Sequence, residues 1–148
     1  MAHHTPRRVA LLSIHPRHAE ALMAGTKRVE LRRTPVRDDT THVIVYATAP
    51  VKAVVGWFQV EGVDVDSQTG IWNTHRHVSG VTRGEFRNYF AGAARASAIR
   101  VAAAHRLETP LSIDAIAGVK RPPQSFQYVD PASIRWLFDD GAGRALTG

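Results

Sequence analysis

The first 33 residues contain the pattern that most limits the folds this chain can adopt. Val9–Ile14 is an uninterrupted apolar run, which predicts a short buried strand. Pro16 then stands where proline is favoured at the start of a helix, and Gly25 is the residue type that most often ends one. Apolar and charged residues alternate from Arg28 to Arg33, which predicts a second strand directly after this glycine. The segment is therefore expected to fold as strand, helix, tight turn and strand.

The alternation in this second strand predicts one buried face and one open face. Val29 and Leu31 are expected to point into the core of the protein. The charged side chains of Arg28, Glu30 and Arg32 are then expected to lie on the open face.

The middle of the chain predicts two more strands. Residues 42–47 are typical of a central strand, and residues 52 to about 63 of a longer one, in which Gly56 and Gly62 mark bends or bulges. Residues 64–80 show no clear periodicity, so we expect irregular structure there, with a short helix around residue 71.

A helix start follows this irregular segment. Thr82 and Glu85 have the spacing of a capping box, in which each side chain bonds the backbone at the other position. Phe86, Tyr89 and Phe90 come next and share one helical face. We interpret this aromatic face as core packing rather than as a platform for stacking bases, because such platforms usually lie on open sheets or loops.

The predicted elements together indicate an α+β fold, a small mixed β-barrel or curled sheet flanked by helices. A strand over residues 96–104 and a helix starting at Asp130–Pro131 complete the order, and strands and helices do not alternate regularly. We expect a single domain over residues 1–148, with a core from about residue 8 to 138 and a frayed tail over 139–148.

Several classes of protein are excluded by what the sequence lacks. It contains no cysteine, so it has no disulfide partner and no thiolate ligand or nucleophile. No run approaches the roughly 20 apolar residues that span a bilayer, and the N-terminus lacks an apolar signal core. We therefore expect a cytoplasmic protein without a membrane partner. The paired histidines, 15 with 18 and 75 with 77, have no third ligand at a suitable spacing, so neither a metal nor a cofactor is expected.

The net charge of +6 is concentrated at one end of the chain. The first 37 residues carry eight basic and two acidic side chains, whereas the remainder carries eleven of each. A local positive excess favours a polyanionic partner such as a nucleic acid. The 16 arginines against three lysines also fit the codon bias of a GC-rich genome, but that bias does not explain why acidic residues are scarce only near the N-terminus.

The turn after the first helix gathers the residues that are best suited to bind a ligand. Gly25 permits a sharp turn, and we expect this turn to extend through Lys27 or Arg28 and to bring Lys27 and Glu30 to one side. Lys27 and Arg32 flank Glu30, and such cations can hold a phosphate while the carboxylate holds a base edge. An ion-pair ladder on a solvated strand fits the same spacing equally well.

This segment also resembles a known family. The G-x-K-x-x-E-x-R signature of ASCH domains, members of the PUA-like superfamily, is matched by Gly25, Lys27, Glu30 and Arg32. Later parts of the chain resemble the family in the same order, at residues 45–47, 50–56, 85–92 and 122–128. The resemblance implies a small β-barrel with flanking helices, a cleft whose wall carries the signature, and RNA or a modified nucleotide as the partner.

We therefore predict a basic cleft that binds RNA or a nucleotide. His15 either lines this cleft, where it could act as a general base, or caps the first helix. The ring of Tyr46 can stack on a base, or it belongs to the core. The predicted ligand contacts are Ser13, His15, Arg17, Gly25, Lys27, Glu30, Arg32, Arg33, Tyr46, Lys52 and Ser125.

The resemblance leaves open whether the protein is an enzyme. One branch of the family hydrolyses N4-acetylcytidine through a K-x-x-T motif, and here Glu30 stands where that threonine would be. The second glutamate of that branch has no match between Glu61 and Glu85. We therefore predict a binding domain first. The alternatives are a domain that senses a small nucleotide, or a hydrolase of a modified nucleoside such as N4-acetylcytidine or of single-stranded RNA, which at least one member cleaves. Lys27 and Glu30, or His15, would be the catalytic residues of such a hydrolase.

Overall fold

The computed structural model of the protein describes residues 5–139. This part of the chain contains six strands, four α-helices and a short 3₁₀ helix. In chain order these elements are β1 (Val9–Ile14), α1 (Pro16–Ala24), β2 (Val29–Arg32), β3 (His42–Ala47), β4 (Ala53–Asp66), α2 (Gln68–His75), α3 (Arg83–Phe90), β5 (Ala96–Leu111), η1 (Ile113–Ala115), β6 (Phe126–Val129) and α4 (Pro131–Asp139).

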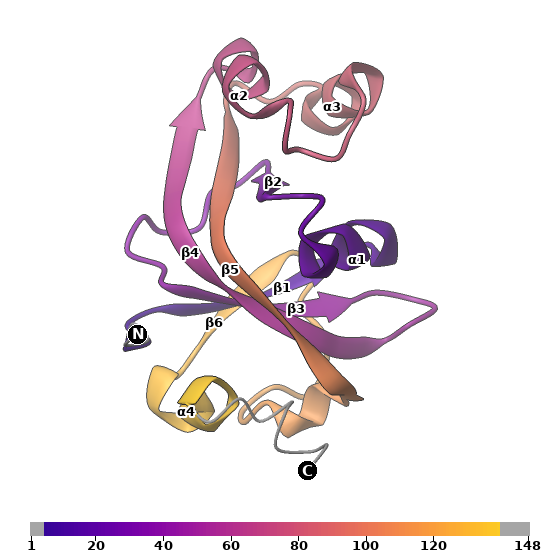
Figure 1. Ribbon diagram of the computed structural model, residues 1–148. Helices are drawn as coiled ribbons and strands as arrows, with labels where there is room; N and C mark the ends of the chain where they lie inside the picture. Colours follow the sequence, from indigo (N-terminus) through magenta and orange to yellow (C-terminus); the bar gives the residue numbers. More distant parts are fainter. Residues whose placement is uncertain (1–4, 140–148) are drawn as a thin grey trace.

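The described strands form one sheet in the order β2-β5-β4-β3-β1-β6. β1 runs parallel to β3, and the other neighbouring pairs are antiparallel. β1 and β3 are mostly apolar, and nearly all of their residues are buried, because both faces of these strands are covered. In Figure 1 the long strands β4 and β5 curve from α2 and α3 at one end of the molecule towards the opposite end, where α4 lies.

The curl of the sheet depends on irregular pairing between β4 and β5. Their register shifts at three places, between Val54 and Gly56, between Gln59 and Val60, and between Val60 and Gly62. Such shifts mark bulges or irregular pairing, and bulges bend a strand and increase its twist. The bends that the sequence predicts at the two glycines therefore lie where the pairing changes register.

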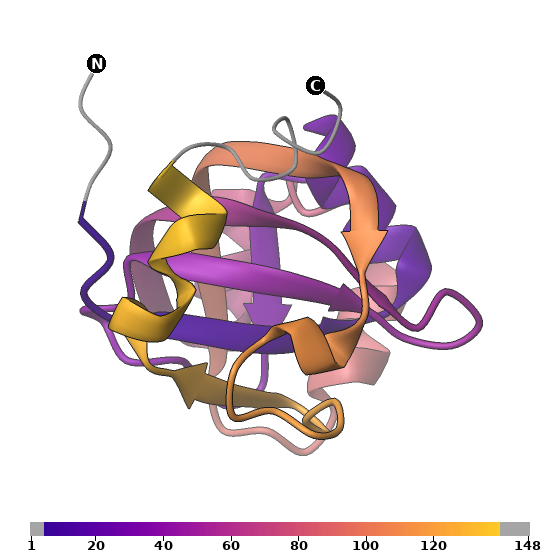
Figure 2. The same ribbon diagram turned by 90° about the horizontal axis from the view of Figure 1, so that it is seen from below.

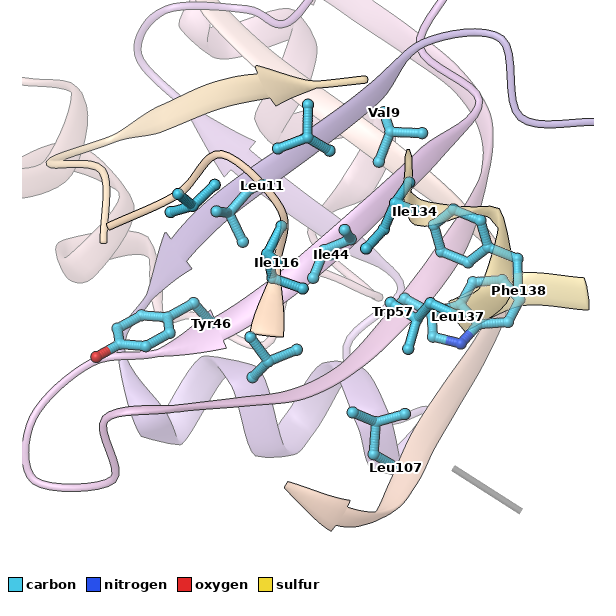
Figure 3. Packing of buried hydrophobic residues seen from close by; sticks show 13 residues of the cluster. Val9, Leu11, Ile44, Tyr46, Trp57, Leu107, Ile116, Ile134, Leu137 and Phe138 are labelled. Atoms are coloured by element: carbon cyan, nitrogen blue, oxygen red, sulfur yellow. The ribbon is translucent and has the colours of Figure 1, made fainter. Parts of the chain in front are cut away.

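Helix α4 covers one face of the curled sheet. Its apolar side chains Ile134, Leu137 and Phe138 pack in one cluster with residues of β1, β3 and β4, among them Leu11 and Trp57 (Figure 3). Figure 2 shows the same helix lying across these strands when the molecule is seen from below. The opposite face packs against α1 through Ala19, Leu22 and Met23, so the central strands are buried on both sides.

Most of the predicted elements are confirmed, and so is the α+β curled sheet with flanking helices. The helix at Pro16 ends at Gly25, which has φ +83°, and the capping box of Thr82 and Glu85 is complete. The final helix begins at Pro131. The frayed tail that the sequence predicts lies outside the described residues, apart from its first residue at the end of α4.

Some local predictions are wrong. Residues 64–66 continue β4 instead of being irregular, whereas the short helix predicted around residue 71 is confirmed as α2, over residues 68–75. The strand predicted over residues 96–104 extends to residue 111, and β6 was not predicted. The predicted open face of β2 is in fact buried. Each error concerns a segment whose environment is set by distant parts of the chain, which local periodicity does not report.

None of the helices in the described part of the chain has the length and hydrophobicity required to cross a bilayer.

The close approach at Gly56 gives a test of this packing. A Cβ atom at Gly56 would meet the Sδ atom of Met23 and would lie 2.5 Å from the carbonyl oxygen of His105. We expect Gly56→Ala to lower the free energy of unfolding by about 1–3 kcal/mol, because the backbone of β5 must move to make room.

Gly84 in α3 provides the matched control for this substitution. A Cβ atom added at Gly84 would have Thr82 Oγ1 as its nearest neighbour, at 3.9 Å, so Gly84→Ala should raise stability by about 0.5–1 kcal/mol through helix propensity. Urea denaturation of both variants measures the difference. Equal stability of the two variants would contradict the close packing of β4 on β5.

Candidate nucleic-acid site

The two edge strands of the sheet are linked by side chains at a seam. β2 and β6 stand at opposite ends of the strand order, yet Arg32 Nη2 at the end of β2 donates to Ser125 Oγ, just before β6, over 2.6 Å. The Arg37 amide donates to the hydroxyl of Tyr128 in β6 over 2.9 Å. We call these contacts the seam, and they hold the curled sheet together where strand pairing does not.

A cavity of about 510 Å³ lies beside this seam, and we call it the seam pocket. Its size suits a ligand as large as a nucleotide. It is lined by Ser13, Ile14, His15, His18, Lys27, Glu30, Leu31, Arg32, Val81, Glu85, Phe86, Tyr89, Gln124 and Ser125. The end of β1, the start of α1, the turn before β2, the last three residues of β2, helix α3 and the loop before β6 therefore all contribute to one site.

Lys27 is buried in the wall of the seam pocket. Its side chain is 2% exposed, and its ammonium group donates to the carbonyl oxygen of Ser79. Burial lowers the pKa of Lys27 because the charged form loses its hydration, and the negative charge of Glu30 opposes this shift. As predicted, the turn after Gly25 extends through residue 28, since β2 begins at residue 29, and Lys27 and Glu30 line the same pocket.

Glu30 and Arg32 form a buried ion pair in the same wall. Arg32 Nη1 lies 3.2 Å from Glu30 Oε2, and the two residues are 7% and 5% exposed. The prediction that these charges lie on an open strand face is wrong. The sheet curls so that this face of β2 becomes the inner wall of the seam pocket. Buried charges of this kind need partners, which the pair and Ser125 supply.

The two histidines at the start of α1 have different roles. His15 caps the helix, because its Nδ1 accepts from the amide of Arg17 over 3.2 Å. With Nδ1 acting as the acceptor, the neutral ring carries its proton on Nε2, so His15 offers a donor rather than a base to the pocket. The pKa of His18 is lowered to about 4 by burial and by the nearby charge of Lys27, which leaves its ring neutral at pH 7.

The rim of the pocket carries an exposed ion pair. Arg17 Nη1 donates to Glu85 Oε2 over 2.7 Å, and Glu85 also completes the capping box with Thr82. The bonds from Arg17 and from the Thr82 amide lower the pKa of Glu85 to about 2. Glu85 is therefore ionised at neutral pH, and its oxygens are engaged by the protein.

The charges that line the seam pocket are balanced. Lys27 and Arg32 supply two positive charges, and Glu30 and Glu85 supply two negative charges. The lining is thus mixed in charge rather than uniformly basic. Among residues 5–139, no group of three or more His, Cys, Asp or Glu side chains is arranged to hold a metal ion.

A second pocket of about 530 Å³ adjoins the first. The two pockets share Ser13 and Gln124, and Ser13 Oγ donates to the carbonyl oxygen of Pro123 over 2.5 Å. Tyr46 and Lys52 line the second pocket. Lys52 is exposed and adopts φ +54°, a left-handed conformation that is uncommon for residues other than glycine and is often found at functional sites.

The structure brings together most of the residues that the sequence predicted as ligand contacts. Those in the seam pocket are Ser13, His15, Lys27, Glu30, Arg32 and Ser125. Tyr46 and Lys52 lie in the second pocket, and Arg17 lies at the rim through its bond to Glu85. Gly25 and Arg33 line neither pocket: Gly25 ends α1, and Arg33 donates to the carbonyl oxygens of Tyr89 and Ala91 at the end of α3.

Sequence reasoning missed the contribution of α3. Phe86 is buried in a core cluster, as predicted, and it also lines the seam pocket. Tyr89, which was also interpreted as a core residue, is 41% exposed and lines the pocket. His18 was also overlooked, although it follows His15 by three residues and so lies near it on the helix surface. The position of α3 over β2 depends on packing between distant segments, for which the sequence carries no local signal.

Comparison with known proteins gives consistent matches. The family model of the ASCH domain matches residues 12–105. A protein of Zymomonas mobilis described as an ASCH domain-containing ribonuclease is 28% identical over 127 residues, which are 83% of this chain and 85% of the relative.

Two crystal structures of ZmASCH variants from the same organism are also similar. In one a tyrosine is replaced by phenylalanine; it has a TM-score of 0.80 and 26% identity and covers 88% of this chain and 96% of that chain. In the other structure a serine is replaced by alanine. It has a TM-score of 0.79 and 25% identity, and the match covers 90% of this chain and 96% of that chain.

The buried lysine should reduce the stability of the fold. We expect Lys27→Met to raise the free energy of unfolding by about 1 kcal/mol at pH 7, because an apolar chain of similar length avoids the loss of hydration. The pKa of Lys27 is lower in the folded than in the unfolded protein, so the charged lysine destabilises the fold fully at pH values below its folded-state pKa. This destabilisation disappears as the pH rises towards the ordinary pKa of 10.5, where the lysine loses its proton in both states.

Chemical denaturation of wild type and variant across the alkaline range measures this cost. The stability gap should narrow as the pH increases. A variant that is less stable than wild type by about 2 kcal/mol or more at every pH would show instead that the lysine stabilises the fold.

Proposed function

The chain belongs to the ASCH domain family, and from this premise we propose that it binds single-stranded RNA in the seam pocket and cleaves the strand there. Binding is supported by a pocket of nucleotide size whose wall carries the family signature. Cleavage is supported by the Zymomonas mobilis relative, which is described as a ribonuclease. Its alignment with this protein covers most of each sequence.

The main support for this proposal is the burial of Lys27 in the wall of the seam pocket. A lysine that is 2% exposed, lies in a pocket wall and has its pKa lowered by burial is expensive for the fold. Strongly perturbed groups in a cleft are candidates for function, since chemistry requires such shifts and folding does not. The cost is consistent with a ligand that needs a fixed, partly desolvated ammonium group at this position.

RNA cleavage needs the kinds of group that the pocket contains. Attack of a 2′-hydroxyl on the neighbouring phosphate requires a proton acceptor, a proton donor for the departing 5′-oxygen and a cation against the developing charge. Burial makes Lys27 a more willing proton donor than an exposed lysine, and its charge suits a phosphate oxygen. His18 is neutral at pH 7, but its lowered pKa makes it a weak proton acceptor, and the carboxylate of Glu30 is a second acceptor in the pocket.

Hydroxyl groups in the two pockets give further support. The crystallised variants of the Zymomonas mobilis protein each remove one hydroxyl, from a tyrosine in one case and from a serine in the other. This chain carries hydroxyls of the same two residue types, on Tyr46 in the second pocket and on Ser125 in the seam pocket. With Lys52, they extend the site along the path that a strand would follow between the adjoining pockets.

A cleavage assay tests the proposal. End-labelled single-stranded RNA of mixed sequence should be converted to shorter fragments by the wild-type protein. Lys27→Met should lower the rate by about 10²–10⁴-fold, the range typical of a lost acid–base group. Lys120→Met is the matched control, because Lys120 is exposed and lines neither pocket, and its rate should equal that of wild type.

Other outcomes identify the alternatives. RNA that is bound but never shortened would indicate a binding domain. Release of acetate from N4-acetylcytidine without RNA cleavage would indicate a hydrolase of modified nucleosides. Equal cleavage by wild type and Lys27→Met would contradict the role of Lys27.

A further inference from the structure

We propose that the seam pocket reads the Watson–Crick edge of one base and selects uracil, by presenting a carboxylate between two cations. This inference rests on the proposed binding of RNA and names the part of the strand that the pocket recognises. Three residues carry it: Lys27, Glu30 and Arg32, all of which line the pocket.

The carboxylate of Glu30 interacts with both cations. Arg32 Nη1 bonds Glu30 Oε2 over 3.2 Å, and the charge of Glu30 also acts on Lys27, which lines the same pocket. All three residues are at most 7% exposed, so water competes poorly for their hydrogen bonds. In chain order, the wall therefore offers a donor, an acceptor and a donor.

These groups retain hydrogen-bonding capacity for a ligand. Within the described residues, the bond from Arg32 uses Oε2 of Glu30, which leaves Oε1 for a donor on the ligand. An ammonium group has three donors, of which Lys27 uses one on Ser79. A guanidinium group has five, and Arg32 directs one to Glu30 and one to Ser125.

Uracil is the base whose edge complements this order. Its Watson–Crick edge presents a carbonyl, an N–H and a second carbonyl. Each carbonyl oxygen can therefore accept from one of the cations, and the N–H can donate to Glu30. Cytosine places its unprotonated N3 acceptor against Glu30, which leaves two acceptors facing each other. Guanine matches two positions but turns its amino group towards a cation, and adenine offers only two groups in all. A mismatch of this kind leaves buried groups unpaired, which is costly.

The remaining walls suit the faces of a base. Leu31 and Val81 are apolar, Phe86 is buried, and Tyr89 is more exposed. Aromatic side chains stack on any base without discriminating between them, so the selection falls to the polar wall.

Binding of RNA that cannot be cleaved tests this inference. We would measure the affinities of four 2′-fluoro adenosine nonamers whose central base is U, C, G or A, at one fixed salt concentration. The U nonamer should bind about tenfold more tightly than the C nonamer, the discrimination expected of one well-matched base edge. A nonamer with 3-methyluridine at the centre lacks the N–H that Glu30 accepts, and it should bind no better than the C nonamer. This last comparison uses only the wild-type protein and does not depend on how any variant folds.

Two variants assign the preference to its residue. In Glu30→Gln the amide can offer a donor to cytosine, so the ratio of U to C affinity should fall to about threefold or less. Glu108→Gln is the matched control: Glu108 is exposed and lines neither pocket, so this variant should preserve the preference.

Failure of this inference differs from failure of the proposed function. Equal binding of all four nonamers, a preference for another base, or an unchanged preference in Glu30→Gln would overturn base reading while RNA binding stands. If none of the nonamers binds, the proposed function itself is wrong.

Discussion

The hydrogen bond from Arg32 to Ser125 is the contact on which the site depends. A curled sheet whose edge strands do not pair leaves unsatisfied groups and a gap, and proteins must cover such edges. Here the gap between β2 and β6 is bridged by one guanidinium group, which also pairs with Glu30. The bridge holds the loop before β6 beside β2 without filling the space behind it, and that space is the seam pocket. The same contact therefore closes the curled sheet and forms one boundary of the seam pocket.

The buried charges in the pocket wall reduce the stability of the fold but are suited to bind a ligand. Lys27, Glu30 and Arg32 are buried, and a wall of apolar residues would be equally or more stable. Two features reduce the cost: Glu30 is shared between the two cations, and Ser79 and Ser125 accept hydrogen bonds from them. The result is a rigid set of donors and one acceptor, arranged before a ligand arrives, so that little ordering is required on binding.

The sequence predicts the local elements well and the environment of the site less well. Val9–Ile14, the helix after Pro16, its end at Gly25 and the capping box of α3 follow from short-range rules and are confirmed. The burial of Glu30 and Arg32 was not predictable, because alternation identifies two faces of β2 but not what covers each. The rim formed by α3 and the loop before β6 depends on contacts across 56 or more residues, for which a single sequence has no local signal.

Backbone amide chemical shifts of the protein can show where on the fold RNA binds. An uncleavable single-stranded RNA would be titrated into isotope-labelled protein and the shift changes mapped on the fold. If RNA occupies the seam pocket, the largest changes should fall on residues 13–18, 27–32 and 122–125, which surround it. Large changes on α4 and η1, at the face of the sheet that those elements cover, with the seam residues unmoved, would contradict it.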